Sequence, residues 1–178
     1  MRLDQKYFIP FLLIVAALCV AAIIFFNLRF MGNQPERLAE RVGDGTELLE
    51  TEFDSFFSDE TLIPLHFADQ PIVALFWASW SARSTRARDA LMRKIEQMEE
   101  TPVVLILAVK DDEAYIQEYF PEPLPSMYIL NGTDYYHDQR IPGLPSLVVF
   151  RPGGIIWGMR FGFTSDADYD FILQLPLE

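Results

Sequence analysis

Cysteine is nearly absent from this sequence: the 178-residue chain has one, Cys19, inside an apolar N-terminal run. A single thiol excludes an intramolecular disulfide, a dithiol redox site and a zinc site built from several cysteines. Histidine is also scarce, and His66 and His137 lie far apart in the sequence, which disfavours a histidine-rich metal site. We therefore expect the chain to carry no metal and no cofactor.

Positive charge is the second shortage. The chain has 14 Lys and Arg against 26 Asp and Glu, which gives a formal net charge of -12. Because no basic excess is present to neutralise phosphates, nucleic acid is not an expected partner. Apolar residues are plentiful, with 51% hydrophobic and 14% aromatic side chains, so the chain has enough material for a folded core.

A long run without charge occupies residues 7–26, with Pro10 as its only helix breaker. About 20 apolar residues are what a helix needs to cross the hydrocarbon core of a bilayer. We predict a transmembrane anchor at 7–26 after a short flank at 1–6. A cleaved signal peptide and a lipid-modified Cys19 are the two alternatives, and the length of the run disfavours the first. Basic residues lie on both sides of the run, so the charges do not fix its orientation.

Residues 27–60 are predicted to form an acidic, membrane-proximal stalk. No Lys or Arg occurs from Val42 to Ala82, whereas eight Asp and Glu do. Five apolar residues interleave with these acids at spacings that fit an amphipathic helix: Leu48, Leu49, Phe53, Phe56 and Phe57. One interpretation is an acidic docking surface. The interpretation that we favour is a solvated helix whose apolar side packs on the following domain.

The remainder of the chain, residues 61–178, alternates apolar runs with helix-forming segments. Continuous apolar runs indicate strands that are buried on both faces, and a turn sequence between two runs indicates a hairpin. We predict strands at Ile72–Ala78, Val103–Val109, Ser146–Phe150 and Ile155–Phe161, and helices at Ala82–Glu99, Asp111–Phe120 and about Ser165–Leu175. The expected order is β-α-β-α-β-β-α, with a parallel first pair of strands and an antiparallel last pair. The segment DYYHD, Asp134–Asp138, contains metal-ligand residue types, but we predict a polar loop there.

Three motifs follow one another in this order: FWASW (Phe76–Trp80) before a helix, GLPSLVVF (Gly143–Phe150), and the hairpin RPGGIIWGMRFG (Arg151–Gly162). Together they resemble the thioredoxin-like fold, an α/β fold with a central mixed sheet flanked by helices. The resemblance assigns Pro145 to the cis-proline position beside the redox pair. It is strongest to a membrane-tethered bacterial branch that includes thiol-disulfide oxidoreductases of cytochrome c maturation. It implies an N-terminal transmembrane helix, a single pass through the bacterial inner membrane, and a domain that faces the periplasm.

The departure from that family is chemical. Active relatives place a W-C-x-x-C motif at a helix start, where the helix dipole lowers the pKa of the attacking thiol. Here the motif reads Trp80-Ser81-Ala82-Arg83-Ser84. A serine hydroxyl stays protonated without a dedicated base and cannot form a mixed disulfide. We therefore predict no catalytic residue and no dithiol chemistry at Ser81 and Ser84, and a structural role for Ser81 as the helix N-cap.

The resemblance also implies a binding groove that does not need sulfur, because thioredoxin-like folds hold extended peptides against the cis-proline loop through backbone hydrogen bonds. We assign this groove to Trp80, Ala82, Arg83, Arg86, Leu144 and Pro145. Arg83 and Arg86 lie in the first turn of the predicted helix, where the dipole disfavours cations. This placement favours binding of a carboxylate or a lipid phosphate. Other basic residues of the helix are expected to pair with Asp89, Glu96 and Glu99.

Our leading hypothesis is a membrane-anchored, redox-inactive thioredoxin-like domain that binds or assembles a protein partner in the cell envelope. This hypothesis assigns the domain no enzymatic activity, whereas the first alternative below does. The first alternative is a thiol-disulfide oxidoreductase whose C-x-x-C is present here as an inactivated S-x-x-S at Ser81 and Ser84, either native or engineered. The second alternative is a structural subunit of a membrane complex.

Overall fold

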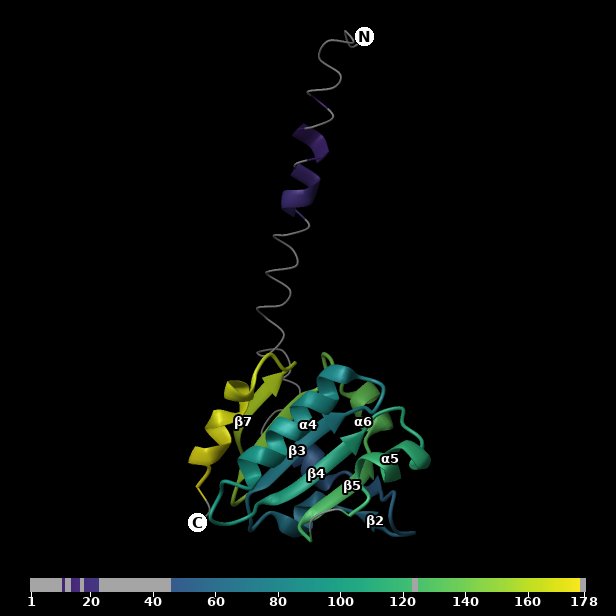
Figure 1. The fold of residues 1–178 in the computed structure, drawn as a ribbon, viewed down its shortest axis with the longest axis vertical. Helices are drawn as coiled ribbons and strands as arrows, with labels where there is room; N and C mark the ends of the chain where they lie inside the picture. Colours follow the sequence, from purple (N-terminus) through teal and green to yellow (C-terminus); the bar gives the residue numbers. More distant parts are fainter. Residues whose placement is uncertain (1–10, 12–13, 17, 23–45, 123–124, 177–178) are drawn as a thin grey trace. The chain divides into compact units, whose positions relative to one another are not determined.

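The structure is a computed structural model that describes residues 11, 14–16, 18–22, 46–122 and 125–176. The chain divides into two compact units, Met1–Arg37 and Leu38–Glu178, whose elements are drawn in Figure 1. In the first unit, residues 11, 14–16 and 18–22 are helical. Within the described ranges, no helix is both long and apolar enough to cross a membrane. Three predicted segments lie wholly or partly outside the described residues. These are the flank 1–6, residues 7–10, 12–13, 17 and 23–26 of the span, and residues 27–45 of the stalk.

A five-stranded mixed sheet forms the centre of the second unit. Its strands run in the order β5-β4-β3-β6-β7. The central strand β3 pairs in parallel with β4, which pairs in parallel with β5, while β6 runs antiparallel to both β3 and β7. The bounds are β3 Ile72–Trp77, β4 Val103–Ala108, β5 Met127–Asn131, β6 Ser146–Arg151 and β7 Ile155–Phe161. The parallel first pair and the antiparallel last pair predicted from the apolar runs are confirmed.

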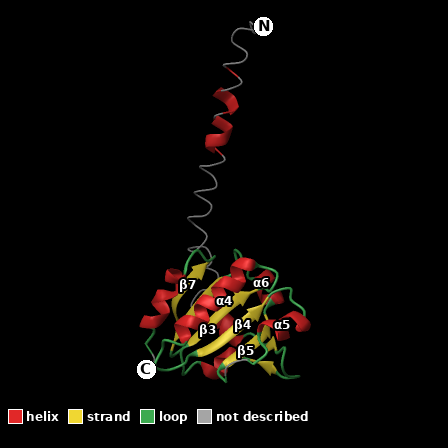
Figure 2. Cartoon of the chain, in the orientation of Figure 1, coloured by secondary structure: helices red, strands yellow, loops and turns green. Residues whose placement is uncertain are grey.

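Side chains alternate between the two faces of the sheet along each strand, so each face has its own core cluster. A different set of helices covers each face. In β3, Val73, Leu75 and Trp77 belong to one core cluster, and the intervening residues belong to a second one. The first cluster includes residues of α4 (Ala82–Ile95), α5 (Glu113–Tyr119) and the 3-10 helix η2 (Asp166–Gln174); the second includes residues of α3 (Thr46–Glu50) and α6 (Thr133–Asp138). Figure 2 shows these helices around the yellow strands. Both faces of β3 and β4 are therefore buried, as their sequences predict.

Strand β5 and helix α6 are among the elements absent from the predicted order, and one helix boundary differs by a full turn. Strand β5 adds a fifth strand to the sheet, and DYYHD lies in helix α6, so the prediction of a polar loop is wrong. Tyr135 explains the helix, because its side chain packs in the second core cluster and is only 6% exposed. Helix α4 ends at Ile95, one turn before the predicted Glu99.

The acidic segment before the predicted domain also belongs to the folded unit. Leu48 and Leu49 of α3 are buried in the second core cluster, as the favoured interpretation expects. The expected helix ends at Glu50, however, and Phe53 lies in a short strand, β1 (Phe53–Asp54), paired with β2 (Thr61–Leu62). Residues 46–60 therefore pack as part of the domain, ahead of the predicted boundary at residue 61.

Candidate functional site

The candidate site lies at one end of the sheet, where three segments meet. Strand β3 ends at Trp77, and the chain enters α4 through Ala78–Ser81. Trp77 is paired with Ala108 of β4, so the residues that follow β4 emerge at the same end. Ser146 of β6 pairs with Phe76, which brings the preceding Leu144–Pro145 peptide to this end as well. That peptide bond is cis, as the resemblance implies.

The two serines of the S-x-x-S motif have different environments. Ser81 is the N-cap of α4: its Oγ accepts a hydrogen bond from the Ser84 backbone N at 3.2 Å. This arrangement satisfies one of the free N–H groups at the helix start and confirms the predicted cap. Ser84 is 0% exposed, and its hydroxyl has no hydrogen-bond partner among the described residues. The first serine thus has a structural task, and the second is a buried polar group without one.

Asp111 fastens the loop before α4 to the loop after β4. Its carboxylate accepts a hydrogen bond from the Ser79 backbone N at 2.8 Å and a second, short one from the Ser79 hydroxyl. The preceding residue, Lys110, has a φ of 53°, which is uncommon for a residue with a side chain. The Lys110 N donates to Thr133 Oγ1 at 3.0 Å, so α6 supports this conformation. The two loops consequently form one hydrogen-bonded unit.

Trp80 is the exposed aromatic residue of that unit. Its indole Nε1 donates to the carbonyl oxygens of Val109 and Lys110 at 3.3 and 3.2 Å. The residue nevertheless remains 62% exposed. An aromatic ring that is held in place and still accessible is typical of a contact residue in protein binding.

A pocket of about 450 Å³ adjoins Trp80 on the side of α5. Of the six predicted groove residues, only Trp80 lines it. Ala82, Arg83 and Arg86 are exposed on α4, whereas Leu144 is half-buried and Pro145 is buried. The lining residues that the sequence interpretation missed are Ser79, Lys110, Asp111, Asp112, Tyr115, Glu118 and Tyr119. The sequence contained one signal for these residues, the acidic pair Asp111 and Asp112 shortly after β4. Residues that follow neighbouring parallel strands meet at one edge of the sheet, so this pair could have been placed beside the loop before α4.

Most basic residues of α4 are engaged in ion pairs. Arg88 contacts Asp89 at 2.5 Å, Arg93 contacts Asp166 at 2.8 Å, and Lys94 contacts Asp170 at 2.6 Å. The pairing with Asp89 is the predicted one, but the other two partners lie on η2 instead of at Glu96 and Glu99. Neither Arg83 nor Arg86 forms an ion pair within the described part of the chain. These two exposed guanidinium groups are therefore the available cations at the start of α4.

Hydrolytic chemistry has no support at the serines. The described residues contain no hydrogen bond between either serine of the motif and a histidine or carboxylate. His66 lies in the 3-10 helix η1 (Pro64–Phe67), and His137 lies in α6, so neither belongs to α4 or its preceding loop. Among the residues that the structure describes, no three His, Cys, Asp or Glu are placed to hold a metal ion.

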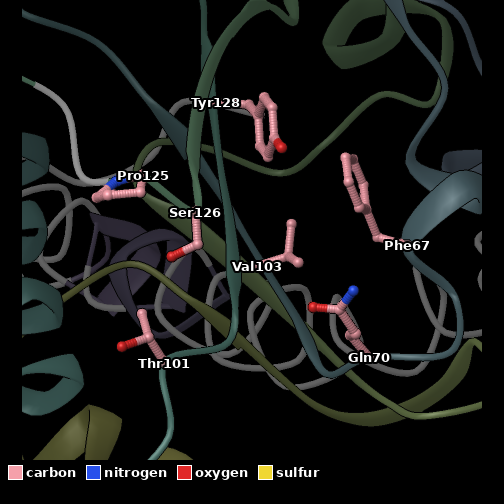
Figure 3. Close-up of a pocket in the computed structure, with 7 residues that line it drawn as sticks. All are labelled: Phe67, Gln70, Thr101, Val103, Pro125, Ser126 and Tyr128. Atoms are coloured by element: carbon pink, nitrogen blue, oxygen red, sulfur yellow. The ribbon is translucent and has the colours of Figure 1, made fainter.

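A second pocket, of about 430 Å³, lies at the opposite end of the sheet. Val103 at the start of β4 separates Phe67 and Gln70 on one side from Pro125 and Ser126 on the other (Figure 3). The Phe67 ring packs against the Tyr128 ring with their centroids 5.0 Å apart. This pocket shares no lining residue with the one beside Trp80.

No protein-family model matches the chain, and no curated protein matches it. Solved structures do match. A secreted disulfide oxidoreductase of Mycobacterium tuberculosis, homologous to E. coli DsbE, aligns with 15% identity over 72% of this chain and 97% of its own, at a TM-score of 0.59. A DsbF homologue from Corynebacterium diphtheriae aligns with 14% identity over 71% of this chain and 84% of its own, also at 0.59. A thioredoxin-like protein from Aeropyrum pernix aligns with 12% identity over 83% of this chain and 98% of its own, at 0.58.

At sequence identities this low, the comparison supports a shared fold and nothing finer. The mixed sheet, the helices on both of its faces and the cis peptide before Pro145 agree with that likeness. Positions 81 and 84 of the chain are nevertheless serines. The chain has a thioredoxin-like α/β fold, similar to that of solved thiol-disulfide oxidoreductases.

Proposed function

We propose that the chain is a redox-inactive thioredoxin-like module that binds a protein partner at the sheet end formed by Trp80 and the cis-proline loop. A dithiol reaction needs two sulfur atoms, and both positions of the motif are serines. The fold around them keeps its cap, its loop connections and its cis peptide. The surface is therefore suited to holding a polypeptide without reacting with it.

Trp80 carries this proposal. Its indole N–H is bonded to two backbone carbonyls, so the ring needs little ordering when a partner binds. Exposed Arg83 and Arg86, with no ion pairs in the described part of the chain, would contact a carboxylate of the same partner. The bound segment would add backbone hydrogen bonds at the loop before β6, in the manner of an added strand.

Binding of an unfolded, thiol-free polypeptide tests the proposal. The probe is fluorescently labelled, S-carboxymethylated insulin B chain, and the measurement is its fluorescence anisotropy with the full-length protein. We expect Trp80→Ala to raise the Kd by about tenfold or more, as loss of a central aromatic contact does. Trp157→Ala is the matched control, because Trp157 is 40% exposed on β7 and lies outside the proposed surface. Equal effects of the two variants, or no binding by the wild-type chain, would refute the proposal.

The oxidoreductase alternative is favoured by a specific observation, the buried and unpartnered hydroxyl of Ser84. In active relatives this position holds the second cysteine, whose sulfur tolerates an apolar environment better than oxygen does. In this alternative, the two serines replace native cysteines, and the double variant Ser81→Cys/Ser84→Cys would restore the dithiol chemistry. The natural coding sequence at positions 81 and 84 decides between the two: serine codons exclude replacement. Insulin reduction by the serine chain above the no-enzyme rate would exclude the redox-inactive function.

The location that we propose is the bacterial inner membrane, with the 7–26 segment as a single-pass anchor and the thioredoxin-like domain in the periplasm. The apolar sequence of the segment supports the anchor. The periplasmic side comes from the resemblance to the membrane-tethered branch. A stable, stoichiometric partner in cross-linked membranes would favour the alternative role of a structural subunit.

A further inference from the structure

A run of hydrogen bonds crosses the end of the sheet at the candidate site, and it begins at the start of α6. The Gly132 backbone N donates to the Ala108 carbonyl at 2.9 Å. A Cβ at Gly132 would lie 2.7 Å from the Leu107 Cβ, so a larger residue would have to push this segment away from β4. Thr133 follows directly, and its backbone N donates to Asn131 Oδ1 at 3.1 Å. The start of α6 is therefore fixed against β4.

Lys110 connects α6 to the loop after β4. Its backbone N donates to Thr133 Oγ1 at 3.0 Å. This bond supports a φ of 53°, a left-handed conformation that is less favourable for a lysine than for a glycine. The Lys110 carbonyl accepts the Trp80 indole N–H at 3.2 Å, and the Val109 carbonyl accepts it at 3.3 Å. The backbone of Lys110 is thus bonded both to α6 and to the exposed Trp80 ring.

Asp111 makes the second connection to Trp80, through the backbone. Both of its carboxylate oxygens accept hydrogen bonds from Ser79: Oδ2 from the backbone N at 2.8 Å, and Oδ1 from the hydroxyl. Ser79 immediately precedes Trp80, so these bonds fix the peptide from which the indole extends. Asp111 is half-buried and forms no ion pair within the described ranges, which leaves the two bonds to Ser79 as its structural task.

We propose that Asp111 is a positioning residue, which sets the affinity for the partner by holding Trp80 in place, and that Thr133 supports it from α6. The role rests on the function proposed for the Trp80 surface. A ring that is already held when the partner arrives loses little conformational freedom on binding, whereas a ring that must first be ordered binds more weakly. Thr133 does not line the pocket beside Trp80, so it acts on this surface through Lys110. Helix α6 belongs to the second core cluster and α4 to the first, so the bonds link the two faces of the sheet.

Two substitutions at one position separate the bonds of Asp111 from its charge. Asp111→Ala removes the carboxylate and both bonds to Ser79, whereas Asp111→Asn removes the same charge and keeps an amide that can bond to the Ser79 N–H and hydroxyl. The measurement is the fluorescence anisotropy of labelled, S-carboxymethylated insulin B chain with the full-length protein. We expect Asp111→Ala to raise the Kd by about fivefold or more and Asp111→Asn to change it by less than about twofold. Equal losses in the two variants would assign the effect to charge and overturn the positioning role.

The indole N–H resonance of Trp80 gives a readout that needs no partner. In the 15N-labelled chain it is assigned by its absence from the spectrum of Trp80→Ala. Thr133→Val keeps the shape of the side chain and removes the acceptor of the Lys110 N–H. We expect Asp111→Ala and Thr133→Val to shift the Trp80 resonance and to raise the Kd, while the resonance of Trp157, which is bonded to η2, stays in place. An unmoved Trp80 resonance or an unchanged Kd in Asp111→Ala would overturn the inference.

Two further variants separate this role from stability. Ile172→Ala weakens the core without removing any of these bonds, so its folded chain should keep the wild-type Kd and Trp80 resonance. If Asp111→Ala does not fold, Ser79→Ala removes one of the two bonds and should change the same two readouts in the same direction. A wild-type chain that does not bind the B chain refutes the proposed function, and the resonance then still decides whether Asp111 positions Trp80.

Discussion

Ser81 and Ser84 lie three residues apart, yet the same hydroxyl group has opposite consequences at the two positions. At Ser81 it satisfies a backbone N–H at the start of α4. At Ser84 it is buried without a partner, so folding removes it from water and returns no hydrogen bond. The first serine therefore stabilises the helix start, whereas the second is a desolvated polar group in the core.

Alanine substitutions at the two serines should therefore change stability in opposite directions. Ser84→Ala removes the buried hydroxyl and adds a better helix former, so we expect the free energy of unfolding to rise by about 1–2 kcal/mol. Ser81→Ala removes the N-cap, and we expect a decrease of about 1 kcal/mol. Urea denaturation of the two variants measures both values. A loss of stability in Ser84→Ala would show that its hydroxyl has a bonding partner.

Two buried tyrosines make stability sensitive to alkaline pH. Burial raises the pKa of Tyr135 and of Tyr169 well above the ordinary value of 10.0, with smaller contributions from Glu47 and Asp168 respectively. Below pH 10 both phenols are protonated in the folded and the unfolded chain, so their full contribution to stability is present. Above pH 10 the unfolded chain loses these protons first, and the free energy of unfolding falls by up to about 1.4 kcal/mol per pH unit for each tyrosine.

Denaturant titrations at pH 8 to 11 measure this slope. Tyr135→Phe/Tyr169→Phe should flatten the decline, because neither phenylalanine ionises. Tyr115→Phe is the control, since the Tyr115 side chain is 54% exposed. An equally steep decline in the double variant would assign the alkaline transition to other groups.

At the scale of the elements, η2 depends on packing more than on its ion pairs. It is a 3-10 helix, whose hydrogen-bond geometry is weaker than that of an α-helix. Tyr169 and Ile172 are each 0% exposed, whereas the Arg93–Asp166 pair is about half exposed on both sides. We expect Ile172→Ala to lower the free energy of unfolding by about 2–4 kcal/mol, and Arg93→Ala to change it by less than about 0.5 kcal/mol.

Urea denaturation and amide hydrogen exchange of η2 measure these effects. The same experiments in high salt separate the two causes, because salt screens an exposed ion pair and leaves apolar burial nearly unchanged. A larger loss in Arg93→Ala than in Ile172→Ala would show that charge pairing holds η2 on α4.

The elements also differ in how far the sequence predicts them. Strands β3 and β4 are predicted to within one residue, because each is an uninterrupted apolar run that is buried on both faces. Strand β5 follows a proline-rich segment and is defined by its pairing with β4, for example Ile106 with Ile129. Its apolar run, Met127–Leu130, is only four residues long, so the pairing defines this strand more than the local sequence does. The sequence does not predict α6 for a similar reason, because Tyr135 becomes a core residue only when the strands that it packs against have formed the sheet.

The candidate site divides in a similar way. Its motifs predict the cap at Ser81 and the cis peptide at Pro145, since both are local features of the chain. The hydrogen bonds from Ser79 to Asp111 are not predicted, because they require Lys110 to adopt a positive φ that its residue type does not indicate. Local sequence patterns therefore predict the start of α4, whereas the pocket beside Trp80 depends on tertiary contacts that such patterns do not predict.

At the scale of the whole molecule, the excess of acids that gives the net charge of -12 is unevenly distributed. The acids of segment 47–54 and α6 gather at one pocket, whereas Arg83 and Arg86 remain exposed at the start of α4. A partner that lies across both surfaces needs a basic residue against these acids and a carboxylate against the two arginines. Opposite charges on two surfaces fix the orientation of a bound polypeptide as well as its affinity.

The apolar run at 7–26 gives a prediction for the full chain in cells. If it anchors the protein, the wild-type chain should stay in the membrane fraction after an alkaline carbonate wash. Ile14→Arg/Leu18→Arg should move the protein to the soluble fraction, because each arginine at the centre of a span costs about 2.5–3.5 kcal/mol. Leu65→Arg is the matched control, since Leu65 is an exposed leucine in the second unit. Carbonate extraction of the wild-type chain would contradict the anchor, and a mature N-terminus beyond Phe26 would identify a cleaved signal peptide.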